Sequence, residues 1–231
     1  MIFLKRRHVH LSILGLLAVM FWVPVTEAVQ IYSNDFEGGV GAEWSSSITD
    51  TTPVGSRKFL GQFNNGTVSL SLGGLAAHTG ATVSFDLFVI QSWDGNGPTA
   101  AGPDAWNLSV VGGSTLLNTT FSNTGSAGNR QAYPDTYPGG DNPSRTGAAE
   151  SNTLGYALYG DTVYNLSFTF AHTLSAMGLE FSASGLQPAF DESWGLDNVR
   201  VSINSIPEPA TLALFGAGLA GLGFSRRKKS A

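Results

Sequence analysis

The strongest constraint on the fold is a two-residue alternation of apolar and polar side chains that recurs along the middle of the chain. It runs through Thr67–Leu72 and again through Thr162–Phe170, and such alternation is typical of half-buried strands. Ala81–Ile90 is apolar on both faces near its end, which is typical of a central strand. No helical periodicity of any length occurs between Gln30 and Ile203. The pattern therefore predicts an all-β domain.

Five further segments have the composition of strands, because they are rich in β-branched and aromatic residues and are separated by Gly, Asn, Asp and Pro. They are Lys58–Phe63, Asn107–Val111, Thr115–Phe121, Gly178–Ala183 and Val199–Ile203. Eight or more short strands in one domain predict an antiparallel β-sandwich, jelly-roll-like, in which two sheets close on one core. The stretch from Ser122 to Asn152 is rich in Gly and Pro, and we expect a long loop there, of a length that is usually functional or disordered. Its aromatic residues favour an ordered loop.

The first 28 residues have the features of an export signal. Lys5, Arg6 and Arg7 precede the apolar stretch Leu11–Val25, and Thr26-Glu27-Ala28 offers small residues at the positions that a signal peptidase reads. We therefore predict a signal peptide at 1–28 and a β-sandwich domain at 29–205. An uncleaved N-terminal anchor is the alternative interpretation.

The last 26 residues have three parts in a fixed order. Ile206-Pro207-Glu208-Pro209 is followed by an uncharged run, 210–224, and then by a cluster of basic residues that begins at Arg226 and Arg227. As a helix the run would span roughly 22 Å, which is shorter than the roughly 30 Å hydrocarbon core. The basic cluster should stay on the cytoplasmic side. The pattern predicts a weak single-pass transmembrane helix, with the upstream domain outside the inner membrane.

This arrangement resembles the PEP-CTERM sorting signal of Gram-negative bacteria that make exopolysaccharide. The resemblance rests on Pro207, Glu208, Pro209, Arg226 and Arg227, within a signal assigned to 206–231. It implies recognition by an exosortase, with cleavage near Pro207–Pro209. It also implies at least transient contact with the inner membrane and a final location in the cell envelope or outside the cell. A plain tail anchor is the alternative.

The charge of the predicted domain is strongly acidic. Between 29 and 205 the sequence has five basic and fifteen acidic side chains. Such a surface makes nucleic acid an unfavourable partner and suits divalent cations or neutral glycans. The chain contains no cysteine, which excludes disulfides and a thiolate zinc site.

Two acidic segments lie near the ends of this domain. Asp35-Phe36-Glu37 stands near its start and Asp197-Asn198-Val199 near its end. The pair resembles calcium-bearing jelly rolls, including carbohydrate-binding modules and MAM-type adhesion domains, in which such segments meet across paired edge strands. By that resemblance Asp35, Glu37 and Asp197 would bind Ca²⁺, which prefers carboxylate and carbonyl oxygens. The alternative is that these are ordinary turn and strand-end residues.

A second group of candidate residues flanks the connection after the predicted central strand. Trp93 and Asp94 end that strand, and Asp104 and Trp106 open the next. We predict that these four residues bind a glycan, because tryptophan faces stack on sugar rings and carboxylates accept hydrogen bonds from hydroxyls. The alternative places the tryptophans in the core and the Asp-Gly pair in a turn.

Signals for catalysis are weak. No G-x-S-x-G, H-E-x-x-H or P-loop motif is present. The neighbours Asp191 and Glu192 would point to opposite faces of a strand. We therefore predict an exported protein that is not an enzyme and that serves adhesion or glycan binding in an exopolysaccharide or biofilm layer. A secreted polysaccharide hydrolase and a structural matrix protein without a specific ligand are the alternatives.

Overall fold

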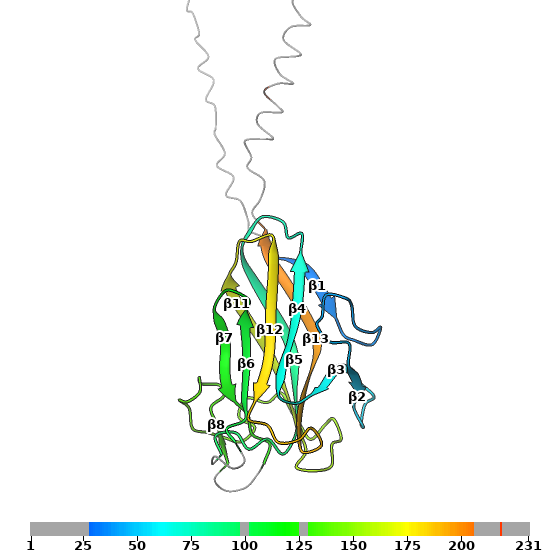
Figure 1. Cartoon of the computed structure of the whole chain (residues 1–231), viewed down its shortest axis with the longest axis vertical. Helices are drawn as coiled ribbons and strands as arrows, with labels where there is room; N and C mark the ends of the chain where they lie inside the picture. Colours follow the sequence, from blue (N-terminus) through cyan, green and yellow to red (C-terminus); the bar gives the residue numbers. More distant parts are fainter. Residues whose placement is uncertain (1–27, 98–101, 125–128, 206–217, 219–231) are drawn as a thin grey trace, which may run out of the picture.

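Two antiparallel sheets pack face to face around one core (Figure 1). The computed structural model describes residues 28–97, 102–124, 129–205 and 218. The larger sheet has the order β10-β11-β5-β13-β3-β2, and β1 also pairs with β13. Its strands are β1 (Ala28–Asn34), β2 (Thr49–Thr51), β3 (Lys58–Phe63), β5 (His78–Gln91), β10 (Glu150–Ser151), β11 (Asp161–Ala171) and β13 (Glu192–Ser205). The predicted all-β antiparallel sandwich is confirmed.

The smaller sheet has the order β4-β12-β6-β7. Its strands are β4 (Gly66–Gly73), β6 (Ala105–Val110), β7 (Thr115–Thr120) and β12 (Ala176–Ser184). A short pair, β8 (Arg130–Gln131) and β9 (Asn142–Pro143), forms within the predicted long loop. Gln131 ties this loop down, since its Oε1 atom accepts hydrogen bonds from the backbone N–H groups of Ser122 and Arg145.

The alternation in the sequence decides which side chains enter the core. Tyr164, Leu166 and Phe170 of β11 all belong to the main buried cluster, as their shared parity predicts. Phe181 of β12 packs against the ring of Phe85 from the facing sheet, with ring centroids 5.3 Å apart and nearly perpendicular planes. Edge-to-face contacts of this kind add to the hydrophobic contribution of aromatic burial.

The outer face of the larger sheet carries a second, smaller apolar cluster, which consists of Phe59, Phe88, Ile90, Leu154 and Val163. Leu154 of this cluster and Tyr156, which packs against it, lie in the segment before β11. Asp161 holds this segment by accepting hydrogen bonds from the backbone N–H groups of Thr153 to Tyr156. Because β5 is covered on both faces near its end, its apolar residues fall on both parities, as predicted for a central strand.

Strand β13 changes its neighbour half-way along. On one edge it pairs with β5 for most of its length. On the other edge Trp194–Leu196 pair with β3, and from Val199 onward the partner is β1. Asp197 and Asn198 stand at the change, where the register with β5 shifts and Asn198 adopts a positive φ of 50°. The irregularity is a β-bulge, a feature that re-aims side chains locally.

A buried histidine pair at the start of β5 should make stability depend on pH. His78 Nε2 and His172 Nδ1 are 2.7 Å apart, and both residues are buried. Burial and the neighbouring His78 lower the pKa of His172 below its usual value of 6.5. The unfolded chain therefore binds a proton at this histidine more readily than the folded chain does. The free energy of unfolding has its full value above pH 6.5 and decreases as the pH falls below it.

We expect the pH dependence of the melting temperature between pH 7.5 and pH 5.5 to differ between the wild type and His172→Gln, because only the wild type carries this acid destabilisation. Thermal melts of both proteins at each pH measure the difference. Parallel pH profiles for the two proteins would contradict the assignment.

Candidate functional site

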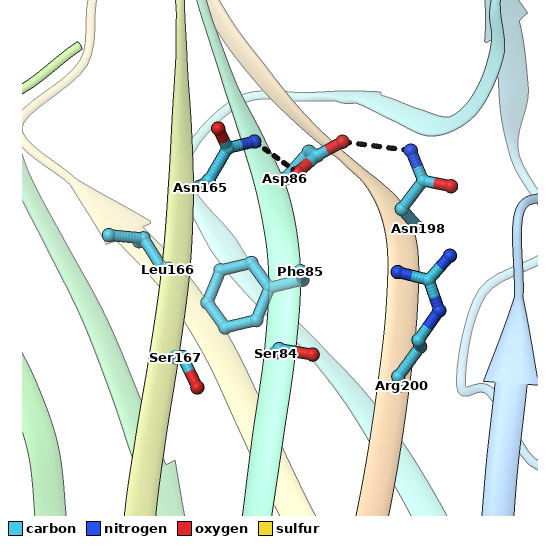
Figure 2. A pocket seen from close by; sticks show the side chains of 8 residues that line it. All are labelled: Ser84, Phe85, Asp86, Asn165, Leu166, Ser167, Asn198 and Arg200. Atoms are coloured by element: carbon cyan, nitrogen blue, oxygen red, sulfur yellow. Dashed lines mark hydrogen bonds between the residues drawn. The ribbon is translucent and has the colours of Figure 1, made fainter. Parts of the chain in front are cut away.

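The exposed face of the larger sheet contains a shallow hollow where β5, β11 and β13 run side by side (Figure 2). Its lining combines hydroxyl, amide, carboxylate and guanidinium groups. The residues are Ser84, Phe85, Asp86, Asn165, Leu166, Ser167, Asn198 and Arg200. Phe85 and Leu166 are buried in the core, so the six polar residues supply the functional groups. The alternation that fills the core thus also places these six side chains on the opposite face.

Asp86 is the centre of the hollow. Asn165 Nδ2 donates a hydrogen bond of 2.5 Å to Asp86 Oδ1, and Asn198 Nδ2 donates one of 2.8 Å to Oδ2 (Figure 2). Asn165 lies directly opposite Asp86 in the β11–β5 register, whereas the bulge in β13 brings Asn198 within reach. The strand register and these two hydrogen bonds therefore fix the three side chains relative to one another.

Arg200 lies along the same face and is exposed. Among the residues that the structure describes, none of the ion pairs includes Arg200. Its guanidinium group is therefore available to an external acceptor, and the group presents several donors in a planar fork.

A guanidinium with three carboxylates borders the hollow. Arg57 lies 3.1 Å from Glu150, 3.5 Å from Asp86 and 3.6 Å from Asp197, and it covers the ring of Phe88 at 4.6 Å. Burial raises the pKa of Asp197 to about 6, with a further increase from Asp86, although the Asn198 backbone N–H and Arg57 act in the opposite direction. The guanidinium of Arg57 is thus the shared ion-pair partner of three carboxylates.

The three predicted calcium ligands have separate partners. The first and last strands do pair as expected, with Asn34 opposite Val199. However, Asp35 Oδ1 accepts from the Glu37 backbone N–H, Glu37 Oε1 accepts from the Lys58 backbone N–H, and Asp197 faces Arg57. Within the described residues these contacts give each carboxylate a partner of its own, and the assignment of the three to one calcium ion stays a prediction.

The structure corrects the predicted role of the two tryptophans. Trp93 and Trp106 both have an exposed fraction of 0%, which leaves no face for a sugar ring. Trp93 Nε1 donates to the Ser193 carbonyl at 2.9 Å, and Trp106 packs edge-on against Trp194 with centroids 6.0 Å apart. The core alternative holds for both residues, since burial is the usual state of a tryptophan that lies between two sheets.

The two aspartates of that prediction do come together, and a glutamate joins them. Within the described part of the chain, Asp94, Asp104 and Glu192 each place a carboxylate oxygen within 4.8 Å of the others. Burial raises the pKa of Asp104 to about 7, and burial together with the Asp104 charge raises that of Glu192 to about 8. Sequence reasoning missed Glu192, although it names the adjacent pair 191–192. The missing signal is a long-range contact, because Glu192 starts β13 and the aspartates flank residues 95–103.

The predicted sorting signal at 206–231, with Pro207, Glu208, Pro209, Arg226 and Arg227, lies outside the described residues apart from position 218, as does nearly all of the predicted signal peptide. The described residues contain no helix that is both long and apolar enough to span a bilayer. The predicted transmembrane helix belongs to the undescribed part of the chain.

Comparisons with solved structures find likenesses of low sequence identity. The K3 cleaved adhesin domain of Lys-gingipain from Porphyromonas gingivalis W83 is 12% identical, with 75% of this chain and 99% of that chain covered and a TM-score of 0.37. A carbohydrate-binding module, CBM28, specific for non-crystalline cellulose, is 17% identical, with 78% and 99% covered and a TM-score of 0.39. The C-terminal CBM6 of LamC, a marine laminarinase from Zobellia galactanivorans, is 13% identical, with 77% and 99% covered and a TM-score of 0.33.

A search of curated proteins finds no match. The PEP-CTERM protein-sorting motif matches residues 205–228, which confirms the predicted sorting signal. The motif implies export, a C-terminal anchor before processing, and processing by an exosortase. The chain therefore carries a PEP-CTERM sorting signal that follows an antiparallel β-sandwich in the sequence.

Proposed function

We propose that this exported β-sandwich binds a glycan in the cell envelope or extracellular matrix, and that the hollow on β5, β11 and β13 is the binding surface. The observation that carries the proposal is the set of six polar side chains that the pairing of β5, β11 and β13 places on one face, each at least partly exposed. Sugar hydroxyls both donate and accept hydrogen bonds. Asp86 can accept from them, while Asn165, Asn198 and Arg200 can donate to them.

The charge of the surface favours a particular class of glycan. Arg200 has no acidic partner in the described ion pairs, and a guanidinium recognises a carboxylate through two parallel hydrogen bonds. Beside it, Asp86 disfavours anions but accepts from hydroxyls. This combination suits a polysaccharide in which neutral sugars alternate with uronic acids, and such binding would serve adhesion within an exopolysaccharide or biofilm layer.

We also propose that the domain is not an enzyme. The hydrolase alternative would need two carboxyl groups on either side of a glycosidic bond. Asp104 and Glu192 have the raised pKa values of general acids, but both have an exposed fraction of 0%. A sugar chain would have no access to them.

Arg200→Ala should weaken binding of the glycan that the protein retains on an array by about tenfold or more, because a hydrogen bond that involves a charged group contributes about 1.5–3 kcal/mol. Asn165→Ala should weaken it less, because it removes a neutral donor, which contributes about 0.5–1.5 kcal/mol. Arg200 is exposed and is in none of the described ion pairs, so Arg200→Ala should change the melting temperature little, whereas Asn165→Ala also removes a hydrogen bond to Asp86 and should lower it slightly. A glycan array that includes uronic acid polymers identifies the ligand, and calorimetry measures the affinities.

Arg130→Ala is the matched control, since it also removes one guanidinium but from β8, where Arg130 pairs with Asp141. It should bind as the wild type does. Release of reducing ends from the same glycans should stay at the buffer level. Unchanged affinity in both hollow variants would refute the binding surface, and catalysed release would favour the hydrolase.

A further inference from the structure

Three carboxylates converge near the end of β5 and the starts of β6 and β13. These strand ends lie at the end of the sandwich where β8 lies (Figure 1). Asp94 follows the end of β5, Asp104 immediately precedes β6, and Glu192 is the first residue of β13. The strand ends therefore bring together acidic residues that lie up to 98 positions apart. The two aspartates are also held by the backbone, since Asp94 forms a β-bridge with Ser122 and the Asp104 N–H donates to the Gly95 carbonyl at 2.9 Å.

Each of the three carboxylates is oriented by hydrogen bonds to one of its oxygens. Asp104 Oδ2 accepts from the backbone N–H groups of Asp94 and Gly95. Glu192 Oε2 accepts from the Gln187 N–H at 2.6 Å. Asp94 Oδ1 accepts from Asn129 Nδ2 at 2.8 Å. These bonds hold the side chains in place while the second oxygen of each buried carboxylate stays open to another partner.

Two of these second oxygens are buried, and within the described part of the chain no N–H or hydroxyl group donates to them. They are Asp104 Oδ1 and Glu192 Oε1, and both residues have an exposed fraction of 0%. A buried polar atom without a partner is strongly unfavourable, and a buried unpaired charge is more so. The described ion pairs bring no Arg or Lys to these carboxylates. The protein therefore supplies no counter-charge for this cluster from its own described side chains.

A divalent cation bound between these carboxylates would supply the positive charge that they lack. Two oxygens bound to one Ca²⁺ at about 2.3–2.6 Å can lie up to about 5 Å apart, whereas two oxygens bound to Mg²⁺ at about 2.0–2.1 Å stay within about 4.2 Å. The three carboxylate oxygens lie within 4.8 Å of one another, which is a span that one calcium ion can bridge. The donors are all oxygens, which disfavours zinc and copper, and Mg²⁺ gives up its waters reluctantly in a buried site.

We propose that Asp94, Asp104 and Glu192 bind one divalent cation of the calcium class, which links the β5–β6 connection to the start of β13. This site is distinct from the Asp35, Glu37 and Asp197 set, and it does not depend on glycan binding. The ion would fix the ends of β5 and β13, the two strands that carry Asp86, Asn198 and Arg200 of the hollow.

Calorimetric titration of the chelator-treated full chain with CaCl₂ tests the proposal, with thermal melts in calcium and in EDTA. We expect one ion per chain and, at a hundredfold excess of calcium over Kd, a folding equilibrium shifted about 100-fold, or about 2.7 kcal/mol. For a domain of this size that shift raises the melting temperature by about 5–11 °C. Glu192→Gln and Asp104→Asn should remove both the heat and the shift.

Asp35→Asn is the matched control, because it neutralises an exposed acidic residue of the other set and should keep the calcium response. Terbium bound at this site should luminesce when tryptophan is excited, since Trp93 precedes Asp94. Calcium should displace the terbium and remove the signal, which tests the site in the wild type without any variant. Absence of a calcium heat in the wild type, with equal melting temperatures in calcium and EDTA, would overturn the proposal and assign the cluster to carboxyl groups that share a proton. A full calcium response in Glu192→Gln and Asp104→Asn would overturn the choice of ligands.

Discussion

Trp106→Ala should destabilise the domain by about 3–5 kcal/mol, the usual range for removing a fully buried tryptophan. Trp106 has an exposed fraction of 0% and contacts the rings of Phe85, Phe181 and Trp194, so truncation leaves a cavity between the two sheets. A change of this size lowers the melting temperature by about 6–20 °C in a domain of 150–250 residues. Thermal and denaturant unfolding of the purified protein measure it.

Trp106→Phe is the control for this variant, because it keeps an aromatic ring in the core and should lose much less stability. Glycan affinity, measured below the melting temperature of each variant, should stay close to the wild-type value. A stable Trp106→Ala protein that had lost glycan binding would restore the original prediction, in which this indole stacks on a sugar.

The burial of Trp106 could have been predicted from the sequence. Trp106, Leu108 and Val110 share one parity of β6, and all three are buried, so alternation places the indole with the core residues. The same argument does not reach Trp93, which follows the end of β5. Its burial depends on tertiary contacts with Phe121 and Ser193, and local patterns do not encode these contacts.

The strands themselves were largely predictable from alternation and composition. Lys58–Phe63 has the predicted bounds, and the other predicted segments lie inside β4, β5, β11, β12 and β13 or overlap β6 and β7. The structure extends several of them, because backbone pairing continues where side chains stop alternating. β5, for example, begins at His78, which pairs with Ser205 of β13, and its Gly80 pairs with Ala171 of β11.

The candidate sites were less predictable, since they depend on which distant residues meet. The pairing of β1 with β13 followed from the two acidic segments, but nothing local indicated that Arg57 would approach Asp197 across 140 positions. A guanidinium at that point gives the acidic segment a structural partner within the protein. The hollow was not predicted at all, because its residues are ordinary polar positions until the register of three strands aligns them.

Arg57→Met should lower the free energy of unfolding by about 2–4 kcal/mol. Removing one partner of a buried ion pair destabilises by about 3–5 kcal/mol, and the partial exposure of Arg57, at 28% of its side chain, reduces that value. Methionine retains an apolar chain over Phe88, so the loss comes chiefly from Asp86 and Asp197, which keep their charges without a counter-ion. Denaturant unfolding at pH 8 measures the effect.

The pH dependence of this loss distinguishes electrostatics from packing. The folded-state pKa of Asp197 is about 6 against 3.8 for a free aspartate, so the folded state binds a proton more readily and stability falls as the pH rises through this window. Arg57 opposes that increase, and its removal should raise the pKa further and widen the window. The destabilisation by Arg57→Met should therefore be larger at pH 8 than at pH 5. Asp197→Asn should recover part of the loss in the double variant, because it removes one of the uncompensated charges. An equal loss at both pH values, with no recovery, would mean that Arg57 acts through its packing on Phe88 alone.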